Sequence, residues 1–239
     1  MQLFHIDSEK IHIKWNNVEI LSVNELLSQL RKVLRIKKWD KICVQYSDKD
    51  WTIRYELLIQ DWTDKDLSGE IISSQTFSFP ERNISMLIAM PNKREKAELI
   101  VQKLTEIWIQ NINFRVSEHS VIRQWNEKKA ERLDKISHEA VEQSRWIQLP
   151  EIKFLKSENE LKEFTHWKNV IIANMNWLPY WELTKESSNN VCGIIGPEGW
   201  FSEKDLNLFD NAKVIDLWEN VLRMETASIV LWWILKNVL

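Results

Sequence analysis

Residues 191–202 read Val-Cys-Gly-Ile-Ile-Gly-Pro-Glu-Gly-Trp-Phe-Ser and contain three of the four glycines in the chain, Gly193, Gly196 and Gly199. The apolar run followed by Gly-Pro-Glu-Gly predicts a buried strand that opens into a tight loop. Glycine there would allow backbone angles that other residues adopt only at a cost, and would let a ligand approach the main chain. Ser202 and Asp205 have the spacing of a capping box, which predicts the start of a helix. Strand, glycine loop and helix in this order are typical of ligand sites in α/β folds.

Composition narrows the class of protein. The 239 residues are 44% hydrophobic and 28% charged, which predicts a globular chain of one large or two modest domains. No apolar run reaches the roughly 18 residues of a membrane span, and Met1 to Lys10 lacks a signal-peptide pattern, so we expect a cytoplasmic protein with no membrane partner.

Cys43 and Cys192 lie in apolar runs, which predicts reduced core thiols, and the five histidines lack ligand spacing, so no metal is expected. The net charge of −3 means that nucleic-acid binding would need a local basic patch.

The pattern of elements changes along the chain. Residues 1–72 predict a small β-barrel of short strands interrupted by one helix, about Val23 to Leu34. The polar, Ser-rich segment Gly69 to Arg82 predicts a linker, so we expect domains at residues 1–72 and 73–239. Beyond it, strands and helices alternate, which predicts an α/β domain with a mainly parallel sheet. Its predicted strands are 84–90, 112–116, 152–155, 170–175, 191–195 and 213–217, and its helices 93–107, 127–144, 158–164 and 222–238.

Basic residues cluster in one short segment of the predicted barrel. Six lie between Arg31 and Lys41, a density that suits a phosphate backbone. A solvated basic turn is the open alternative. The helix 127–144 carries a second basic group, for which a charged solvent face is the favoured interpretation.

The ratio of tryptophan to glycine is abnormal. Average composition, about 7% glycine, predicts roughly 17 glycines in this chain, which instead has 4 glycines and 14 tryptophans. Trp39, Trp51, Trp108 and Trp200 fall where turns and helix ends favour glycine. We hypothesise that several tryptophans are glycines in the living cell, misread because the source organism decodes UGA as glycine. A genuinely Trp-rich protein is the alternative.

Several motifs together resemble one family. Ile195-Gly-Pro-Glu-Gly199, Leu222-Arg-Met-Glu-Thr-Ala227, Lys103-Leu-Thr-Glu106, Glu139-Ala-Val-Glu-Gln-Ser144, and Val33-Leu-Arg35 followed by Trp39-Asp40 occur in the order of the RsmE family. That family comprises 16S ribosomal RNA uracil-N3 methyltransferases of the SPOUT superfamily. Where its pattern has glycine, this chain has Trp108, Trp200 and Trp218. The family's Ser-Glu-Arg-Ser appears as Ser117-Glu-His-Ser120, and the arginine expected after Gln-Ser is displaced to Arg145.

The resemblance implies a fold and a cofactor. It implies a C-terminal SPOUT-type α/β domain with a trefoil knot, an exception to unknotted topology, preceded by a PUA-like β-barrel that binds RNA. It also implies a homodimer that binds S-adenosylmethionine through the backbone of three loops. Carried across residue by residue, the cofactor-binding positions are Ala173, Met175, Ile195, Gly196, Gly199, Ile215, Leu217, Trp218 and Leu222.

The implied chemistry is methyl transfer to a ring nitrogen, which needs alignment and stabilisation of charge on the uracil. Arg223 is the candidate for stabilisation, with a salt bridge to Glu198 or Glu225 as the alternative. Glu198 is a candidate to remove the proton, although a loop carboxylate that accepts amide hydrogen bonds is the favoured interpretation. The expected partner is 16S ribosomal RNA in the small subunit, with RNA-binding candidates at Arg31, Lys32, Arg35, Lys38 and Arg145.

Two other functions stay open. One is a SPOUT enzyme that methylates ribose 2′-hydroxyls, which the Leu-Arg-Met-Glu-Thr-Ala motif and the N-terminal barrel disfavour. The other is an inactive RNA-binding or ribosome-assembly protein, which becomes preferred if Trp200 and Trp218 are genuine, because an indole at either position would fill the cofactor slot.

Overall fold

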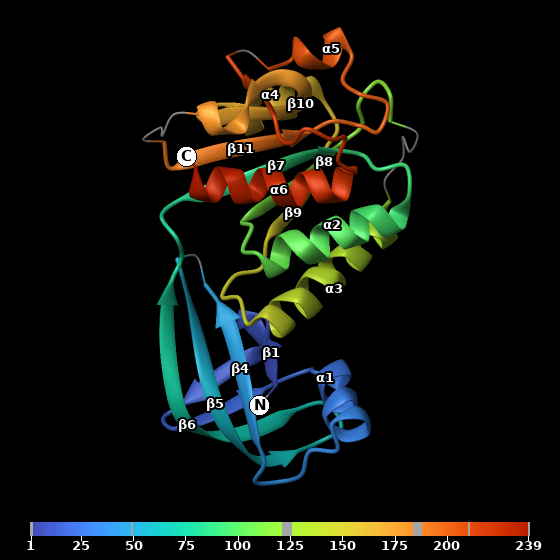
Figure 1. Ribbon diagram of the computed structural model, residues 1–239. Coiled ribbons are helices and arrows are strands. Elements are labelled where there is room, and N and C mark those ends of the chain that lie inside the picture. Colours follow the sequence, from blue (N-terminus) through green and yellow to red (C-terminus); the bar gives the residue numbers. More distant parts are fainter. Residues whose placement is uncertain (1, 49, 121–125, 184–187, 210, 239) are drawn as a thin grey trace. The chain divides into compact units, whose positions relative to one another are not determined.

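The chain folds into two compact units. The computed structural model describes residues 2–48, 50–120, 126–183, 188–209 and 211–238, and Figure 1 shows its helices and strands. The N-terminal unit comprises residues 1–79 and 141–148, and the C-terminal unit comprises residues 80–140 and 149–239. No helix among the described residues is both long and apolar enough to pass through a bilayer.

The N-terminal unit is built on a six-stranded sheet in the order β1-β4-β5-β6-β3-β2. Val18, Ile20, Leu57 and Ile59 are fully buried at alternate positions of their strands, as a half-buried sheet requires. Its elements are β1 (Leu3–His5), η1 (Ser8–Lys10), β2 (Ile11–Lys14), β3 (Asn17–Ile20), α1 (Asn24–Ser28), η2 (Gln29–Val33), β4 (Lys41–Ser47), β5 (Trp51–Trp62) and β6 (Leu67–Ser78).

One sequence prediction for this unit is corrected. The segment Gly69 to Arg82, predicted as a linker, is mostly strand β6, which pairs with β5 from Trp51↔Ser78 to Trp62↔Leu67. The helix predicted over 23–34 is confirmed as helical from Asn24 to Val33, with its second half, Gln29–Val33, in π-helical form.

The C-terminal unit contains a six-stranded sheet in the order β12-β10-β11-β7-β8-β9, with every neighbouring pair parallel. This confirms the predicted parallel sheet and the mixed α/β class. Its elements are β7 (Asn83–Ala89), α2 (Arg94–Glu106), β8 (Asn111–Arg115), α3 (Glu127–Ser144, whose last turn belongs to the N-terminal unit), β9 (Glu151–Leu155), α4 (Glu158–Thr165), β10 (Asn169–Pro179), η3 (Tyr180–Glu182), β11 (Asn190–Ile195), α5 (Glu203–Leu206), β12 (Lys213–Asp216) and α6 (Met224–Asn237).

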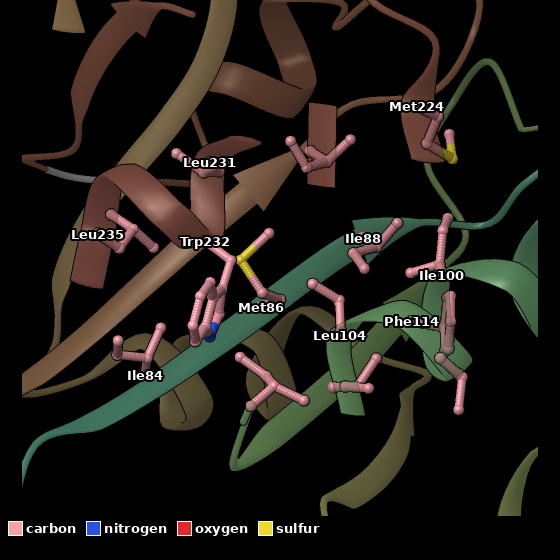
Figure 2. Close-up of a cluster of buried hydrophobic side chains, with 14 of the residues drawn as sticks. Ile84, Met86, Ile88, Ile100, Leu104, Phe114, Met224, Leu231, Trp232 and Leu235 are labelled. Carbon is pink, nitrogen blue, oxygen red and sulfur yellow. The ribbon is translucent and has the colours of Figure 1, made fainter. Parts of the chain in front are cut away.

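Helices cover both faces of this sheet. Met86 and Ile88 of β7 pack into the core formed with α2 and α6, which Figure 2 shows. Leu87, between them, belongs to the opposite cluster with Leu161 of α4. Because successive strand residues point to opposite faces and helices cover both, β7 is apolar from Met86 to Ala89.

Gly193 of β11 lies under α6. A Cβ atom at this position would come within 2.8 Å of side-chain atoms of Leu231, Leu235 and Met86. The glycine therefore allows α6 to pack closely on β11.

Both cysteines are free and buried, as predicted. Burial raises the pKa of the Cys192 thiol to about 12 and raises the pKa of Cys43 above its usual value. Both thiols are therefore protonated at neutral pH and unsuited to nucleophilic chemistry.

Candidate active site

Three parallel strands of the C-terminal unit lie side by side. Ala173 of β10 is in register with Ile195, the last residue of β11, and with Ile215 of β12. The loops after β11 and β12 therefore emerge at the same edge of the sheet, where α/β folds place ligands. Strand β10, predicted to end at residue 175, continues to Pro179, and its register with β12 shifts between Ala173 and Leu178. The structure thus brings together three segments that the sequence separates by tens of residues.

A cavity of about 550 Å³ lies at this edge. Seven of the nine predicted cofactor-binding residues line it, as do both catalytic candidates, Glu198 and Arg223; Gly199 and Ile215 are not among the lining residues. The lining residues are Asn92, Lys93, Lys96, Ala173, Asn174, Met175, Ile195, Gly196, Pro197, Glu198, Trp200, Phe201, Asp216, Leu217, Trp218, Asn220, Val221, Leu222, Arg223, Met224 and Ala227.

The glycines of the 191–202 stretch act through close packing. No glycine in the chain has a positive φ, so the prediction that this loop uses glycine for special backbone angles is wrong. A Cβ atom on Gly196 would lie 2.6 Å from Cε2 of Phe201. Glycine at 196 therefore makes room for the Phe201 ring, which lines the cavity. The positive φ of the loop falls on Trp200, at 68°.

The loop ends at a helix cap, as predicted. Ser202 Oγ accepts a hydrogen bond from the Asp205 backbone N–H, and the Asp205 side chain accepts one from the Ser202 N–H, which completes the capping box of α5. This reciprocal cap satisfies two N–H groups and fixes the point where the glycine loop leaves the cavity.

Glu198 is held by groups from the start of α2. Its Oε1 accepts hydrogen bonds from Lys96 Nζ at 2.8 Å and from the Asn92 backbone N–H at 3.3 Å. Partial burial by itself would raise the pKa of Glu198. The hydrogen bond from Lys96, the backbone hydrogen bonds and the charge of Lys96 outweigh burial, so the net pKa lies below its ordinary value. Glu198 is therefore ionised at neutral pH and engaged, which is the second of the two interpretations made from the sequence.

Arg223 is available to a ligand. It stands immediately before α6, and its exposed side chain has no hydrogen bond or ion pair among the described residues. The alternative that it is tied to Glu198 or Glu225 finds no contact in that part of the chain. A guanidinium free at the rim of a cavity can donate two parallel hydrogen bonds to a flat acceptor.

Asn92 also lines the cavity. Its backbone N–H is the group that donates to Glu198, and its Oδ1 is buried with no hydrogen-bond donor within the described ranges.

Comparisons with known proteins identify this arrangement. Residues 79–236 match the family described as RNA methyltransferase domain. The chain belongs to this RNA methyltransferase domain family. The result confirms the family resemblance that the motifs indicated.

Individual relatives agree with the family. The chain is 31% identical over 151 residues to ribosomal RNA small subunit methyltransferase E of Rickettsia conorii, a match that spans 57% of each protein. It has the fold of the Neisseria gonorrhoeae methyltransferase E bound to S-adenosyl methionine, with a TM-score of 0.81, 18% identity, and coverage of 99% of this chain and 96% of that one. A Legionella pneumophila protein, described as a methyltransferase and solved with bound cofactor SAM, gives a TM-score of 0.80 at 20% identity, with 99% and 97% covered.

Three side chains that contact the glycine loop or line its cavity are not among the residues predicted for the site. Lys96 and Asn92 follow β7, the strand beside β11, so the rule that parallel strands end at one edge would have found them. His119 Nδ1 lies 3.0 Å from the carbonyl oxygens of both Gly199 and Trp200. His119 occupies the position where the family has arginine, so the departure from the pattern marked a contact to this loop.

The N-terminal unit contains the RNA-binding candidates, and they differ in how they are held. Arg31 NH1 lies 3.4 Å from Asp64 Oδ1 and its guanidinium stacks over Trp62, while Lys38 Nζ lies 2.8 Å from Asp61 Oδ1. In contrast, Lys32 and Arg35 are exposed with no side-chain partner in the described residues.

Arg145 belongs to the same unit. Its carbonyl oxygen accepts a hydrogen bond from Arg54 at 2.8 Å, and its φ is positive, at 56°. The backbone at Arg145 is thus fixed by contacts within the N-terminal unit.

Proposed function

We propose that this protein transfers a methyl group from S-adenosylmethionine to N3 of a uridine in 16S ribosomal RNA. The observation that carries the proposal is the exposed guanidinium of Arg223, which has no partner among the described residues, at the rim of a cavity lined by β10, β11 and β12. Family membership supports methyl transfer to RNA. The name of the Rickettsia relative supports the small ribosomal subunit as the source of the substrate.

The residues around the cavity fit S-adenosylmethionine. A volume of about 550 Å³ lies within the range of small-molecule sites. Backbone near Ile195 and Gly196 and around Leu217 and Leu222 would hold the adenosine moiety.

The proposed mechanism assigns separate roles to two side chains. When bound, S-adenosylmethionine supplies a methyl group activated by a sulfonium. N3 of the uracil loses its proton to solvent and then takes the methyl group, leaving the neutral thioether. Arg223 donates hydrogen bonds to the uracil and stabilises the negative charge that the loss of the N3 proton leaves on the ring. Glu198, already engaged by Lys96, keeps the glycine loop in place and helps to orient the reacting groups.

Further features of the RsmE family are proposed for this chain with that function. They are a trefoil knot in the C-terminal domain, closure of the N-terminal sheet into a PUA-like barrel that binds RNA, domains bounded at residues 72 and 73, and a homodimer that completes the site. The exposed Lys32 and Arg35 support RNA binding by the N-terminal domain.

The test is methyl transfer to defined RNA. Purified protein is incubated with small subunits or 16S RNA and with S-adenosylmethionine carrying a labelled methyl group, and the product is mapped by primer extension. Methylation at N3 blocks the Watson–Crick edge, so the proposal predicts label in RNA and one strong stop at a uridine. Label without a stop, together with a gap in the alkaline hydrolysis ladder, would indicate ribose 2′-O-methylation instead.

A second function is favoured by one observation. Trp200 and Trp218 both line the cavity. The cavity of about 550 Å³ is what remains with both indoles in place. If the working protein has these indoles, the cofactor has less room than glycine at 200 and 218 would leave, and an RNA-binding protein without methyl transfer is the alternative. It predicts RNA binding without cofactor binding in the same assays.

A further inference from the structure

Tryptophans occupy backbone positions that bulky side chains avoid. Nine non-glycine residues among those described have a positive φ, and five of them are tryptophans, although tryptophan makes up only 14 of 239 residues. A positive φ is rare for L-residues and a true outlier for bulky ones. The five are Trp15 (59°), Trp39 (73°), Trp108 (80°), Trp167 (64°) and Trp200 (68°).

Trp15 is in a tight hairpin. Lys14 pairs with Asn17 across β2 and β3, so Trp15 and Asn16 form a two-residue loop. A positive φ at the first loop residue alone defines the II′ type of turn, whose first residue is glycine. The Trp15 side chain is 98% exposed, so no packing compensates for the strained backbone.

Trp39 is the third residue of a β-turn. The Asp40 N–H donates to the Lys37 carbonyl at 3.1 Å, and of the two central residues only Trp39 has a positive φ. This is the type II pattern, which requires glycine or asparagine at the third position. The Trp39 N–H also donates to the Ile59 carbonyl at 2.7 Å, which fixes the turn against β5.

Trp108 ends helix α2 in a Schellman motif. Its N–H donates to the Thr105 carbonyl, and the Ile109 N–H donates to the Leu104 carbonyl, both at 3.1 Å. The residue at this position of the motif is left-handed and is usually glycine. Trp167 follows the C-cap of α4 in the same left-handed conformation and is 84% exposed.

Trp200 is in the glycine loop at the cavity. Its N–H donates to the Pro197 carbonyl at 3.0 Å, and the left-handed residue of the loop is Trp200 rather than Gly199. Its side chain lines the cavity. Four of the five sites are therefore turns or helix ends whose geometry favours glycine. The fifth, Trp200, also has a positive φ and lies beside the cavity.

Other described tryptophans have the negative φ that is usual for L-residues. The sign of φ therefore divides the described tryptophans into two groups. Trp146 and Trp232 are buried in the cores of their units and have no positive φ. Trp51 begins strand β5 and Trp218 also lacks a positive φ, so backbone geometry does not assign glycine to either.

We infer that residues 15, 39, 108, 167 and 200 are glycine in the protein as its own cell makes it, because UGA codons at these positions are read there as glycine. The chain then has nine glycines, and five of its nine left-handed positions among the described residues are occupied by the residue that adopts them without strain. The inference rests on backbone geometry and composition and does not depend on the proposed function.

Peptide mass spectrometry of protein isolated from its native host tests the inference directly. We expect the peptides that cover the five positions to be lighter than the printed sequence requires by the difference between tryptophan and glycine at each. Tryptophan found at any of the five positions would overturn the inference for that position, and tryptophan at all five would overturn it entirely.

Recombinant variants test the geometric argument separately. Trp→Gly and Trp→Ala at each position both remove the indole, but only glycine removes the Cβ that opposes a positive φ. We expect the Gly variant to melt higher than the Ala variant by about 2–4 °C at each position. Trp233, exposed within helix α6, is the matched control, and there Trp233→Gly should melt below Trp233→Ala. If the Gly variant melted below the Ala variant at the five positions as well, the positive φ there would not favour glycine.

Discussion

Lys96 Nζ donates a hydrogen bond to Glu198 Oε1 at 2.8 Å, across 102 residues of sequence. The contact joins the start of helix α2 to the glycine loop, and both side chains are largely shielded from solvent, at 24% and 29% exposure. It therefore fixes one wall of the cavity to another.

Loss of the Lys96 contact should loosen the loop. Lys96→Met and Glu198→Gln are each expected to weaken S-adenosylmethionine binding by roughly two- to tenfold. This is the expected effect of losing one charged hydrogen bond that is not fully buried. The double variant should lose no more than the worse single variant, because the two side chains act together. Lys93→Met is the control, since Lys93 lines the same cavity without contacting Glu198. An equal loss of cofactor affinity in this control would mean that the positive charge of the cavity, and not the contact with Glu198, supports binding.

Acid should weaken binding only well below neutral pH. The folded-state pKa of Glu198 is lower than its ordinary value of 4.5. A lowered pKa means that the ionised carboxylate favours the ordered loop above about pH 4.5, and that this contribution disappears as pH falls through the lower, folded-state value. Cofactor affinity measured from pH 8 downward should thus be level until below pH 4.5. In Glu198→Gln this acidic decline should be absent, and an unchanged decline would assign it to another group.

Arg223 should affect turnover more than binding. Arg223→Ala is expected to lower methyl transfer by about 10²–10³-fold, the cost of removing one group that stabilises developing charge. Cofactor affinity should stay within a few-fold. Arg223→Lys keeps the charge but loses the planar pair of donors, so it should recover only part of the rate. Single-turnover rates with saturating RNA decide the matter, and full activity of the alanine variant would exclude Arg223 from the chemistry.

RNA affinity should depend most on the cations of the N-terminal unit that have no side-chain partner among the described residues, Lys32 and Arg35. Lys32→Ala and Arg35→Ala should each lower the slope of log affinity against log salt by about 0.7–0.9 if each residue contacts one phosphate. Arg31 and Lys38 already have carboxylate partners in Asp64 and Asp61, so their alanine variants should change the slope less. Filter binding at several salt concentrations measures this, and equal slopes for all four variants would argue against this surface.

Much of the C-terminal fold could be predicted because its strands are continuous apolar runs. Parallel strands buried on both faces, such as β7 and β11, have this pattern. Strand β6 was missed because residues 72–76 are exposed and Ser-rich, which is also typical of a loop; only its pairing with β5 distinguishes the two. The sequence of β6 alone does not show this pairing, so it does not distinguish an exposed strand from a loop.

The site was predictable where motifs lie together in sequence and not where the fold joins distant segments. Glu198 and Arg223 come from recognisable loops, whereas Lys96 enters the cavity only because β7 and β11 are neighbours. The backbone angles of the loop were assigned to the wrong residue, because glycine can be selected for close packing as well as for a positive φ. Gly196 serves the Phe201 ring, and the left-handed angle lies at Trp200.

The most direct measurement is calorimetric titration of S-adenosylmethionine into two forms of the whole chain, the printed sequence and the Trp200→Gly, Trp218→Gly double variant. The account predicts saturable binding by the double variant, at least tenfold tighter than by the printed sequence, because two indoles leave the cavity lining. Absence of binding by a folded double variant would contradict the claim that this cavity is the site of a methyl donor.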